Sequence, residues 1–348
     1  AVVRLQLPTA GYDTTFNVAA NSLFSKSLTH KVIDLESAPA DMVLNSGMKI
    51  TSDELITVVY DFISDTVDIS PGAANNPETY SLKGQNGMGL EFVVPFQTLW
   101  NNRALGTDRN GDGIVTQPKQ FFSIVATEDN TTVYIKPKAD VVGGHPADVT
   151  YSVVLPLAGN VYTCENTTLL TSDPGETLSG SIVVADKPVA VTINDDSVNP
   201  SGGGGCFDLM GDQIVPTDVI GNEYNINEGD LNAGSNESIF IVATENFTSL
   251  TLNDGVASTA LINQGDTYQY PIDQPLTSLI ANKPVYVVHM SGYGCELGMA
   301  IIPPSNCAGS GQVSFSRNND NAFFLNLLCP SGSEADFTLT GPGAPPIL

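Results

Sequence analysis

The chain has 348 residues, more than a single hydrophobic core usually serves, so several modules or a repeat array are expected. Its 38 acidic residues outweigh 13 basic ones and give a formal net charge of -25, a surface that repels phosphate backbones and argues against nucleic-acid binding. No apolar run reaches the roughly 18 residues that a transmembrane segment needs.

Residues 1–40 are assigned to N-terminal strands that belong to no defined module. Along the whole chain, aliphatic and β-branched residues are plentiful, and 32 glycines and 22 prolines are scattered among them. This mix is typical of many short strands joined by turns. No long stretch shows helical periodicity with caps, so the predicted fold class is all-β.

Three kinds of segment recur along the chain in the same order. The first is a hairpin, "SIVATEDNTTVYI" at 123–135 and "FIVATENFTSLTL" at 240–252. The second is a pair of strands around a small turn, at 48–60, 181–193 and 278–290; in the last two the turn is an Asx residue followed by Lys-Pro. The third is a strand that closes on proline, as in "LEFVVPF", "DQIVPTDVIGNEY" and "MAIIPPSN". This shared order favours a repeat over chance similarity between hairpins.

The repeat region is predicted to span residues 41–340. Its cycles cover roughly 41–120, 121–237 and 238–320, an incomplete copy occupies 321–341, and residues 342–348 resemble a linker. Each cycle holds about seven or eight strand-sized runs, which fit a β-propeller of about seven short blades or a row of tandem β-sandwich modules. In a propeller, the incomplete copy would supply the closing strand.

The sharpest local motif is "DRNGDG" at 108–113. Asp108, Asn110 and Asp112 stand at alternate positions, and a glycine then allows the turn that wraps their oxygens around a cation. The carbonyl of Ile114 and the side chain of Thr116 would add ligands, although Lys119 occupies the place of the usual closing acid. The motif predicts a structural Ca²⁺ that holds a long loop; the alternative is an Asx-rich turn without metal.

The five cysteines show no zinc-binding spacing and favour an oxidising, extracellular location. Cys295 and Cys307 bracket a short proline-stiffened loop, and a disulfide there would stabilise the fold by about 2–3 kcal/mol. Cys164 and Cys206 are a second candidate pair, which leaves Cys329 free or paired outside this stretch.

Signatures of catalysis are missing from the sequence. It contains no GxSxG, HExxH or GxGxxG motif, and its three histidines have no neighbour at metal-ligand or triad spacing. Trp100, the single tryptophan, follows the strand "EFVVPF" and is interpreted as a half-buried core residue rather than a sugar-stacking platform.

Several of these segments resemble a known family. "MKITSDELITVV", "GDQIVPTDVIGNEY", "FIVATE", "ANKPVYVV" and "GCELGMAIIPPSNCAGSGQVSFSR" followed by "FFLNLL" are similar to the IgGFc-binding protein N-terminal domain family, as found in large secreted surface proteins of Bacteroidota. The resemblance covers roughly residues 40 to 340 and implies an extracellular, adhesin-like module. In those bacteria O-glycans are attached at Asp-Ser/Thr-apolar triplets, which here would place them on Thr14, Thr66 and Ser197.

The leading hypothesis is therefore an extracellular, non-enzymatic surface module for adhesion or surface assembly. Its partners would be a protein or glycan at a cell or matrix surface, or other copies of itself. One alternative is the subunit of an extracellular filament, assembled by strand pairing between chains. A further alternative is a propeller that binds or cleaves a polysaccharide, in which acids and an aromatic side chain would converge on one cleft.

Overall fold

The computed structural model describes residues 1–62, 78–104, 106, 115, 117–198, 207–232, 236–253, 257–294, 296–306, 309, 311, 313, 315 and 325–338. Within them the chain forms strands β1 to β22 and one four-residue α-helix, α1 (Val32–Leu35). The predicted all-β fold class is confirmed. None of the helices in these residues is long and apolar enough to cross a membrane.

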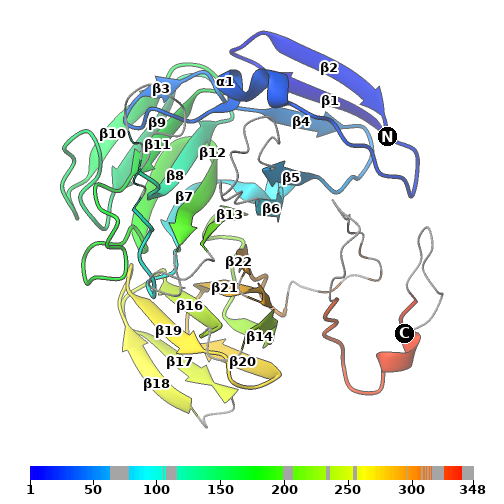
Figure 1. Ribbon diagram of the computed structural model, residues 1–348, viewed down its shortest axis with the longest axis vertical. Helices are drawn as coiled ribbons and strands as arrows, with labels where there is room; N and C mark the ends of the chain where they lie inside the picture. Colours follow the sequence, from blue (N-terminus) through cyan, green and yellow to red (C-terminus); the bar gives the residue numbers. More distant parts are fainter. Residues whose placement is uncertain are drawn as a thin grey trace. The chain divides into compact units, whose positions relative to one another are not determined.

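Residues 1–316 form one compact unit and residues 317–348 form a second. In the second unit, residues 325–338 contain the 3-10 turn η5 (Glu334–Asp336) and no strand. All strands named below belong to the first unit, where they fall into three sets that follow one another along the chain (Figure 1).

The N-terminal set contains a sheet in the order β2-β1-β4 and the strand pair β5-β6. Its strands are β1 (Val2–Leu7), β2 (Tyr12–Asn17), β4 (Lys49–Ser52), β5 (Val59–Phe62) and β6 (Glu78–Ser81).

The middle set is organised around one long strand, β12. The first half of β12 lies between β9 and β7, and its second half pairs with β8 and then with β13. β11 pairs with β8 on one edge and with the short β3 (Val43–Leu44) on the other. The strands of the set are β7 (Met88–Val94), β8 (Gln120–Ala126), β9 (Thr131–Lys136), β10 (Tyr151–Leu155), β11 (Val161–Glu165), β12 (Ser181–Val198) and β13 (Asp208–Ile214).

The third set forms two sheets, in the orders β14-β20-β17-β18 and β19-β16-β21-β22, with β15 parallel to β21. Its strands are β14 (Glu223–Asn227), β15 (Asp230–Leu231), β16 (Ser238–Ala243), β17 (Thr248–Leu252), β18 (Ala257–Ile262), β19 (Thr267–Pro271), β20 (Leu276–Ala281), β21 (Val285–Gly294) and β22 (Glu296–Ile301).

The middle and third sets share one order of strand pairings. β8 pairs with β11 and the second half of β12, as β16 pairs with β19 and β21. β9 pairs with β10 and the first half of β12, as β17 pairs with β18 and β20. In the N-terminal set, β1 lies between β2 and β4 in the same way. β7 falls in the cycle predicted for 41–120 but pairs with β12 of the next cycle.

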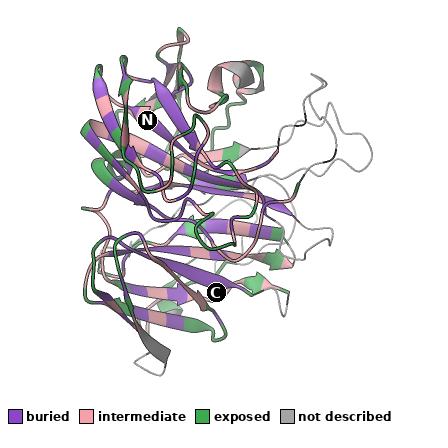
Figure 2. Ribbon diagram, turned by 90° about the vertical axis from the view of Figure 1, so that its left-hand side faces the viewer, coloured by how far each residue is buried: buried purple, intermediate pink, exposed green. Residues whose placement is uncertain are grey.

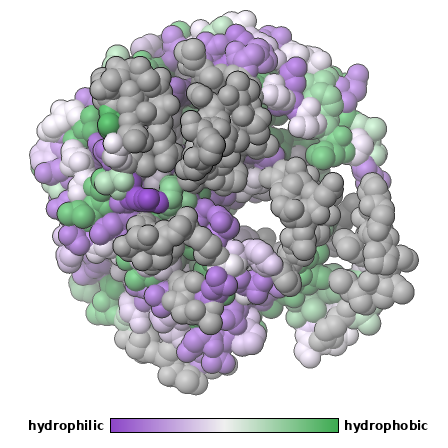
Figure 3. Space-filling model, in the orientation of Figure 1, coloured by the Kyte–Doolittle hydropathy of each residue, from purple (hydrophilic) through white to green (hydrophobic). Residues whose placement is uncertain are grey.

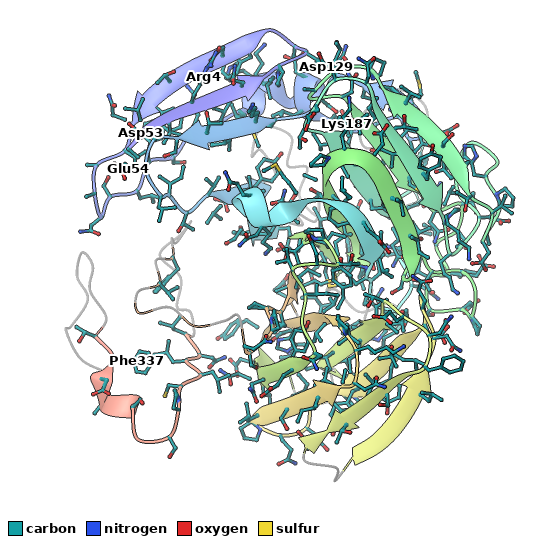
Figure 4. All side chains as sticks on the ribbon, turned by 180° about the vertical axis from the view of Figure 1, so that it is seen from behind. Arg4, Asp53, Glu54, Asp129, Lys187 and Phe337 are labelled. Carbon is teal, nitrogen blue, oxygen red and sulfur yellow. The ribbon has the colours of Figure 1, made fainter. Side chains whose placement is uncertain are left out.

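The two recurring hairpins also share their hydrogen bonds. The hydroxyl of Thr127 donates to the carbonyl oxygen of Pro188 over 2.5 Å, and Thr244 donates to that of Pro284 over 2.7 Å. The Lys187 ammonium donates to the Asp129 carbonyl over 2.5 Å, as the Lys283 ammonium does to that of Asn246 over 2.6 Å (Figure 4). Both Lys-Pro segments are therefore bound to the preceding hairpin by the same contacts.

The apolar run of β16 is buried on both faces, which explains why it lacks the usual alternation with polar residues. Ile239 and Ile241 enter a core made by the third set alone. Phe240 points the other way, into a core that also contains Phe122 and Ile193 of the middle set. The middle and third sets are therefore packed together through a shared core, and Figure 2 shows buried residues along the strands of both.

Candidate functional site: a buried acidic centre

Three strands, one from each set, meet in the first unit. β13 of the middle set packs against β6 of the N-terminal set and against β22 of the third set. These strands bring together Glu78 from β6, Asp208 and Asp212 from β13, and Glu296 from β22. Lys83, just beyond the end of β6, supplies a positive charge. We refer to these five residues as the acidic centre.

Asp212 makes an ion pair and two backbone hydrogen bonds within the acidic centre. Its side chain is only 2% exposed and lies 2.9 Å from the Lys83 ammonium. One carboxylate oxygen accepts a hydrogen bond from the Ile301 amide over 2.9 Å, and the other accepts from the Gln213 amide over 2.8 Å. Burial raises the pKa of Asp212, and the Lys83 charge opposes that shift.

Asp208 lies four residues before Asp212 on β13 and makes an equivalent contact to the third set. Its Oδ2 accepts a hydrogen bond from the amide of Leu297 over 2.8 Å. Burial and, to a lesser degree, the neighbouring Glu296 carboxyl raise the pKa of Asp208 to about 7, and the Leu297 hydrogen bond opposes that shift. Asp208 and Asp212 together fasten β13 to the backbone of β22 through side chains rather than through a strand ladder.

Glu78 has no ion-pair partner among the described residues and lies close to other acids. It is 9% exposed, and its Oε1 accepts a hydrogen bond from the Thr79 amide over 2.8 Å. Its Oε2 is buried and has no hydrogen-bond partner among the described residues. Burial raises the pKa of Glu78 to about 8, and the charges of Asp212 and Asp208 act in the same direction.

This arrangement places an amine next to a carboxyl group, with a second, proton-retaining carboxyl group nearby and little access for water. No set of three or more His, Cys, Asp or Glu side chains among the described residues has the geometry to hold a metal ion. A polysaccharide chain cannot reach Asp212 or Glu78 because both are buried. The centre is suited to proton transfer and to chemistry between its own side chains.

The residues of the predicted calcium site, Asp108, Asn110, Asp112, Ile114 and Thr116, all lie outside the described residues. The two ends of the loop that carries them are both fastened to the end of β12. The Arg103 amide donates to the Ser197 carbonyl over 2.7 Å, and the Asp196 amide donates to the Lys119 carbonyl over 3.3 Å. Calcium binding therefore stays a prediction for a loop whose ends are held close together.

A fully buried carboxylate, Asp195, lies beside this loop base. Gln97 and Asn102 donate side-chain amide hydrogens to it over 2.9 and 2.7 Å, and Gln120 donates over 3.1 Å. Burial raises the pKa of Asp195 to about 6, and the three amide donors oppose that shift. Trp100, next to this network, packs against the shared core, as expected from the sequence.

The predicted disulfides fall partly or wholly outside the described residues. Cys295 and Cys307 are both outside them, so their bridge stays a prediction. Cys164 is a free, buried thiol that accepts a hydrogen bond from the Tyr151 hydroxyl over 3.6 Å, and burial raises its pKa to about 12. Cys206 lies outside the described residues, so the suggested Cys164–Cys206 bridge stays a prediction. Cys329 is also a free thiol.

Of the predicted O-glycan acceptors, Thr66 lies outside the described residues and Thr14 is a half-buried residue of β2. Ser197 is 3% exposed, and its hydroxyl donates to the Asp196 carboxylate over 3.1 Å. A glycan on Ser197 would need this hydroxyl at the surface, and glycosylation at the three positions stays a prediction.

The acidic centre was missed by the sequence reasoning. Its residues are spread from position 78 to 296, and no local spacing connects them. The available signal was indirect: Asp208 and Asp212 interrupt the apolar strand "FDLMGDQIV", where a core strand would carry aliphatic residues.

These observations define an all-β module of three strand sets, with a cluster of acidic side chains buried where β6, β13 and β22 meet. Residues 78–346 match the family of the IgGFc binding protein. The match covers most of the 348 residues, and the chain belongs to this family, whose members are extracellular, non-enzymatic binding domains. Comparison with curated proteins and with solved structures gave no match.

Proposed function

We propose that this chain is a rigid extracellular module that binds a protein partner at a cell or matrix surface and catalyses no reaction on it. Its family membership and strongly acidic composition support this proposal. We propose secreted surface proteins of Bacteroidota as its setting, on the resemblance of its motifs alone. The family's description names immunoglobulin G Fc, which makes Fc the first partner to test.

We also infer that the three strand sets are copies of one two-sheet β-sandwich module. The shared order of pairings and the repeated Thr-to-Pro and Lys-to-turn hydrogen bonds support this inference. Two sheets facing across one core are typical of a β-sandwich, whereas propeller blades are single four-stranded sheets around a channel. We therefore favour tandem sandwiches over the propeller.

The observation that carries the binding proposal is a pair of exposed apolar positions that recurs in the middle and third sets. Val184 of β12 lies beside Tyr134 of β9, and Ile280 of β20 lies beside Thr251 of β17, which occupies the same hairpin position. Val154 and Leu261 are likewise equivalent on the neighbouring strands. The four side chains are between 40% and 67% exposed.

A single exposed aliphatic side chain is ordinary on a protein surface, where contiguous apolar area is what marks an interaction site. The recurrence of the exposed pair in two sets at the same register gives a binding face with two equivalent anchor points. Figure 3 shows hydrophobic and hydrophilic residues interspersed over the described residues of one face.

The test measures binding of the 348-residue chain to immobilised immunoglobulin G Fc and to a mucus glycoprotein. Val184→Asp and Ile280→Asp should each weaken binding at least about tenfold, since each buries a charge at a contact. Leu170→Asp is the matched control, because Leu170 is equally exposed in a loop away from both sheets. Equal binding by all three variants would refute the face, and no binding to any extracellular protein would refute the function.

The second candidate function is a filament subunit that assembles by strand pairing. It is favoured by the edge strands β2 and β10, each of which pairs on one side only among the described strands. Electron microscopy of the purified chain distinguishes the two candidates. Long polymers would support the filament, and discrete particles at high concentration would exclude it.

We propose in addition that Ca²⁺ binds Asp108, Asn110 and Asp112, with Ile114 and Thr116 completing its ligands. Calcium should raise the melting temperature of the chain, because a ligand that binds only the folded state stabilises it by mass action. Asp112→Ala should abolish this rise, and Asp173→Ala, at an exposed acid elsewhere, should retain it. A melting curve that is the same with calcium and with a chelator would contradict the site.

A further inference from the structure

Among the ion pairs that a lysine or arginine makes with a carboxylate in the described residues, the Lys83–Asp212 pair is the most enclosed. The Lys83 nitrogen lies 2.9 Å from Oδ1 and 3.0 Å from Oδ2 of Asp212, so it faces the carboxyl carbon between them. Asp212 is 2% exposed and Lys83 is 23% exposed. The backbone of Lys83 is held as well, since its amide donates to the Gln213 side chain over 2.6 Å.

A second, independent feature lies beside this pair. Glu78 is buried, and its Oε2 lacks a hydrogen-bond partner among the described residues. It faces the charges of Asp212 and Asp208, and both disfavour its ionised form. A carboxyl group that retains its proton at neutral pH, in a site shielded from water, is suited to act as a general acid.

The surroundings also polarise the Asp212 carboxyl group. The amides of Ile301 and Gln213 donate to its two oxygens over 2.9 and 2.8 Å. Backbone N–H groups in this position stabilise the negative charge that develops on a carbonyl oxygen under nucleophilic attack. The site therefore holds a nucleophile, an activated carboxyl group and a proton donor in fixed positions.

We propose that the Lys83 amine and the Asp212 carboxyl group condense into an intramolecular isopeptide bond, with Glu78 transferring the protons. Deprotonated Lys83 Nζ attacks Cγ of the protonated Asp212 carboxyl group and forms the new N–C bond. One carboxyl oxygen leaves as water when Glu78 donates its proton to it, and Glu78 then takes the proton that Nζ gives up. The sum is amine plus carboxylic acid to amide plus water, so no oxidant or co-reactant is needed.

The bond would join positions 129 residues apart in sequence and would tie the N-terminal set to the middle set. This location has a physical use in an extracellular module, because the two sets meet here through side chains and packing rather than through a strand ladder. A covalent link would keep them together when a bound partner pulls on the chain.

The test is the intact mass of the denatured 348-residue chain, followed by peptide mapping. The chain should be lighter than its sequence by one water molecule, and digestion should yield a branched peptide that joins Lys83 to Asp212. Lys83→Arg keeps the ion pair but removes the nucleophile, and Glu78→Gln keeps the size but removes the acid, so both variants should show the full mass.

Lys119→Arg is the matched control, since Lys119 is about as exposed as Lys83 and pairs with Glu165 over 3.1 Å. It should retain the mass deficit, and no peptide should join positions 119 and 165. A full mass for the unmodified chain, with separate peptides containing Lys83 and Asp212, overturns the proposal. A deficit that maps to any other residue overturns it as well. These readings do not depend on whether the chain binds a partner.

Discussion

A Cβ atom on Gly180 would lie 1.9 Å from the carbonyl oxygen of Gly265, closer than any side chain can approach. Gly180 ends the loop before β12, and Gly265 follows β18, so the contact joins the middle and third sets. The same contact occurs one set earlier, where a Cβ on Gly47 would lie 2.4 Å from the carbonyl oxygen of Gly159. Each pair lets two backbones touch where successive sets meet.

The first prediction concerns this contact. Gly180→Ala should lower the free energy of unfolding by about 3 kcal/mol or more, because the residue combines a φ of +91° with a backbone clash. Gly175→Ala is the control: its φ is +84°, but nothing lies within 4 Å of an added Cβ, so it should cost only about 1 kcal/mol. Urea unfolding of both variants measures the difference. Equal losses would show that backbone conformation alone, and not the contact, sets the cost.

The repeated hairpin could be found from the sequence because its turn chemistry is local. Asp186-Lys187-Pro188 and Asn282-Lys283-Pro284 both place an Asx acceptor against the hairpin. Only 282–284 separate two strands as expected, between β20 and β21, whereas 186–188 lie inside the continuous β12, where the register with β7 shifts between Val184 and Val189. The N-terminal copy is harder to recognise in the sequence. Asp53 supplies the same Asx acceptor, but Glu54 and Leu55 stand where the other two sets have Lys-Pro. Its geometry is nevertheless the same, because the Val2 amide donates to Asp53 Oδ1 over 2.6 Å (Figure 4).

Contacts between sets could not be predicted in the same way. The acidic centre needs β6, β13 and β22 to meet, and this depends on how whole sheets pack rather than on any spacing along the chain. The burial of Ser197 is a related case, since its triplet does not encode the register shift between Asp195 and Val198 in which it lies.

The second prediction concerns the shared acceptor of these turns. Asp186→Ala should cost about 1 kcal/mol, because it leaves the Thr132 amide without the hydrogen bond that it donates over 2.7 Å. Asp186→Asn should cost much less, since Asn282 performs the same role for the Ser249 amide over 2.8 Å in the third set. Thermal unfolding of the two variants tests this. An Asn variant as unstable as the Ala variant would mean that the charge, and not the acceptor, is required.

The third prediction concerns the buried Asp195. Three side-chain amides donate to its carboxylate, so the site requires a group that only accepts hydrogen bonds. Asp195→Asn would point an amide donor at those donors and should cost about 2–4 kcal/mol at neutral pH. Asp173→Asn makes the same charge change at an exposed residue and should cost less than about 0.5 kcal/mol. Similar urea midpoints for the two variants would contradict the reading of this network.

The fourth prediction is a pH dependence that arises at Glu78. Its pKa is about 8 in the folded chain and 4.5 in an unperturbed glutamate, mainly because burial disfavours the charged form. The folded chain therefore binds a proton that the unfolded chain has already released. The stabilisation is fully present below the unfolded pKa and is lost as the pH rises through the folded pKa.

The Gln side chain of Glu78→Gln is neutral at every pH, so the variant lacks this contribution. Its free energy of unfolding should therefore rise relative to that of the unmodified chain as the pH rises from about 5 to 8. The difference in unfolding free energy between the two proteins should change by up to about 1.4 kcal/mol per pH unit, the value for the binding of one proton. Asp208, whose pKa is raised to about 7, remains in the variant and keeps part of the dependence in both proteins. Urea unfolding at several pH values, with the exposed Glu91→Gln as the charge control, measures the slope. A difference that stays constant with pH would mean that Glu78 is ionised in the folded chain, and it would also remove the proton donor that the isopeptide reaction needs.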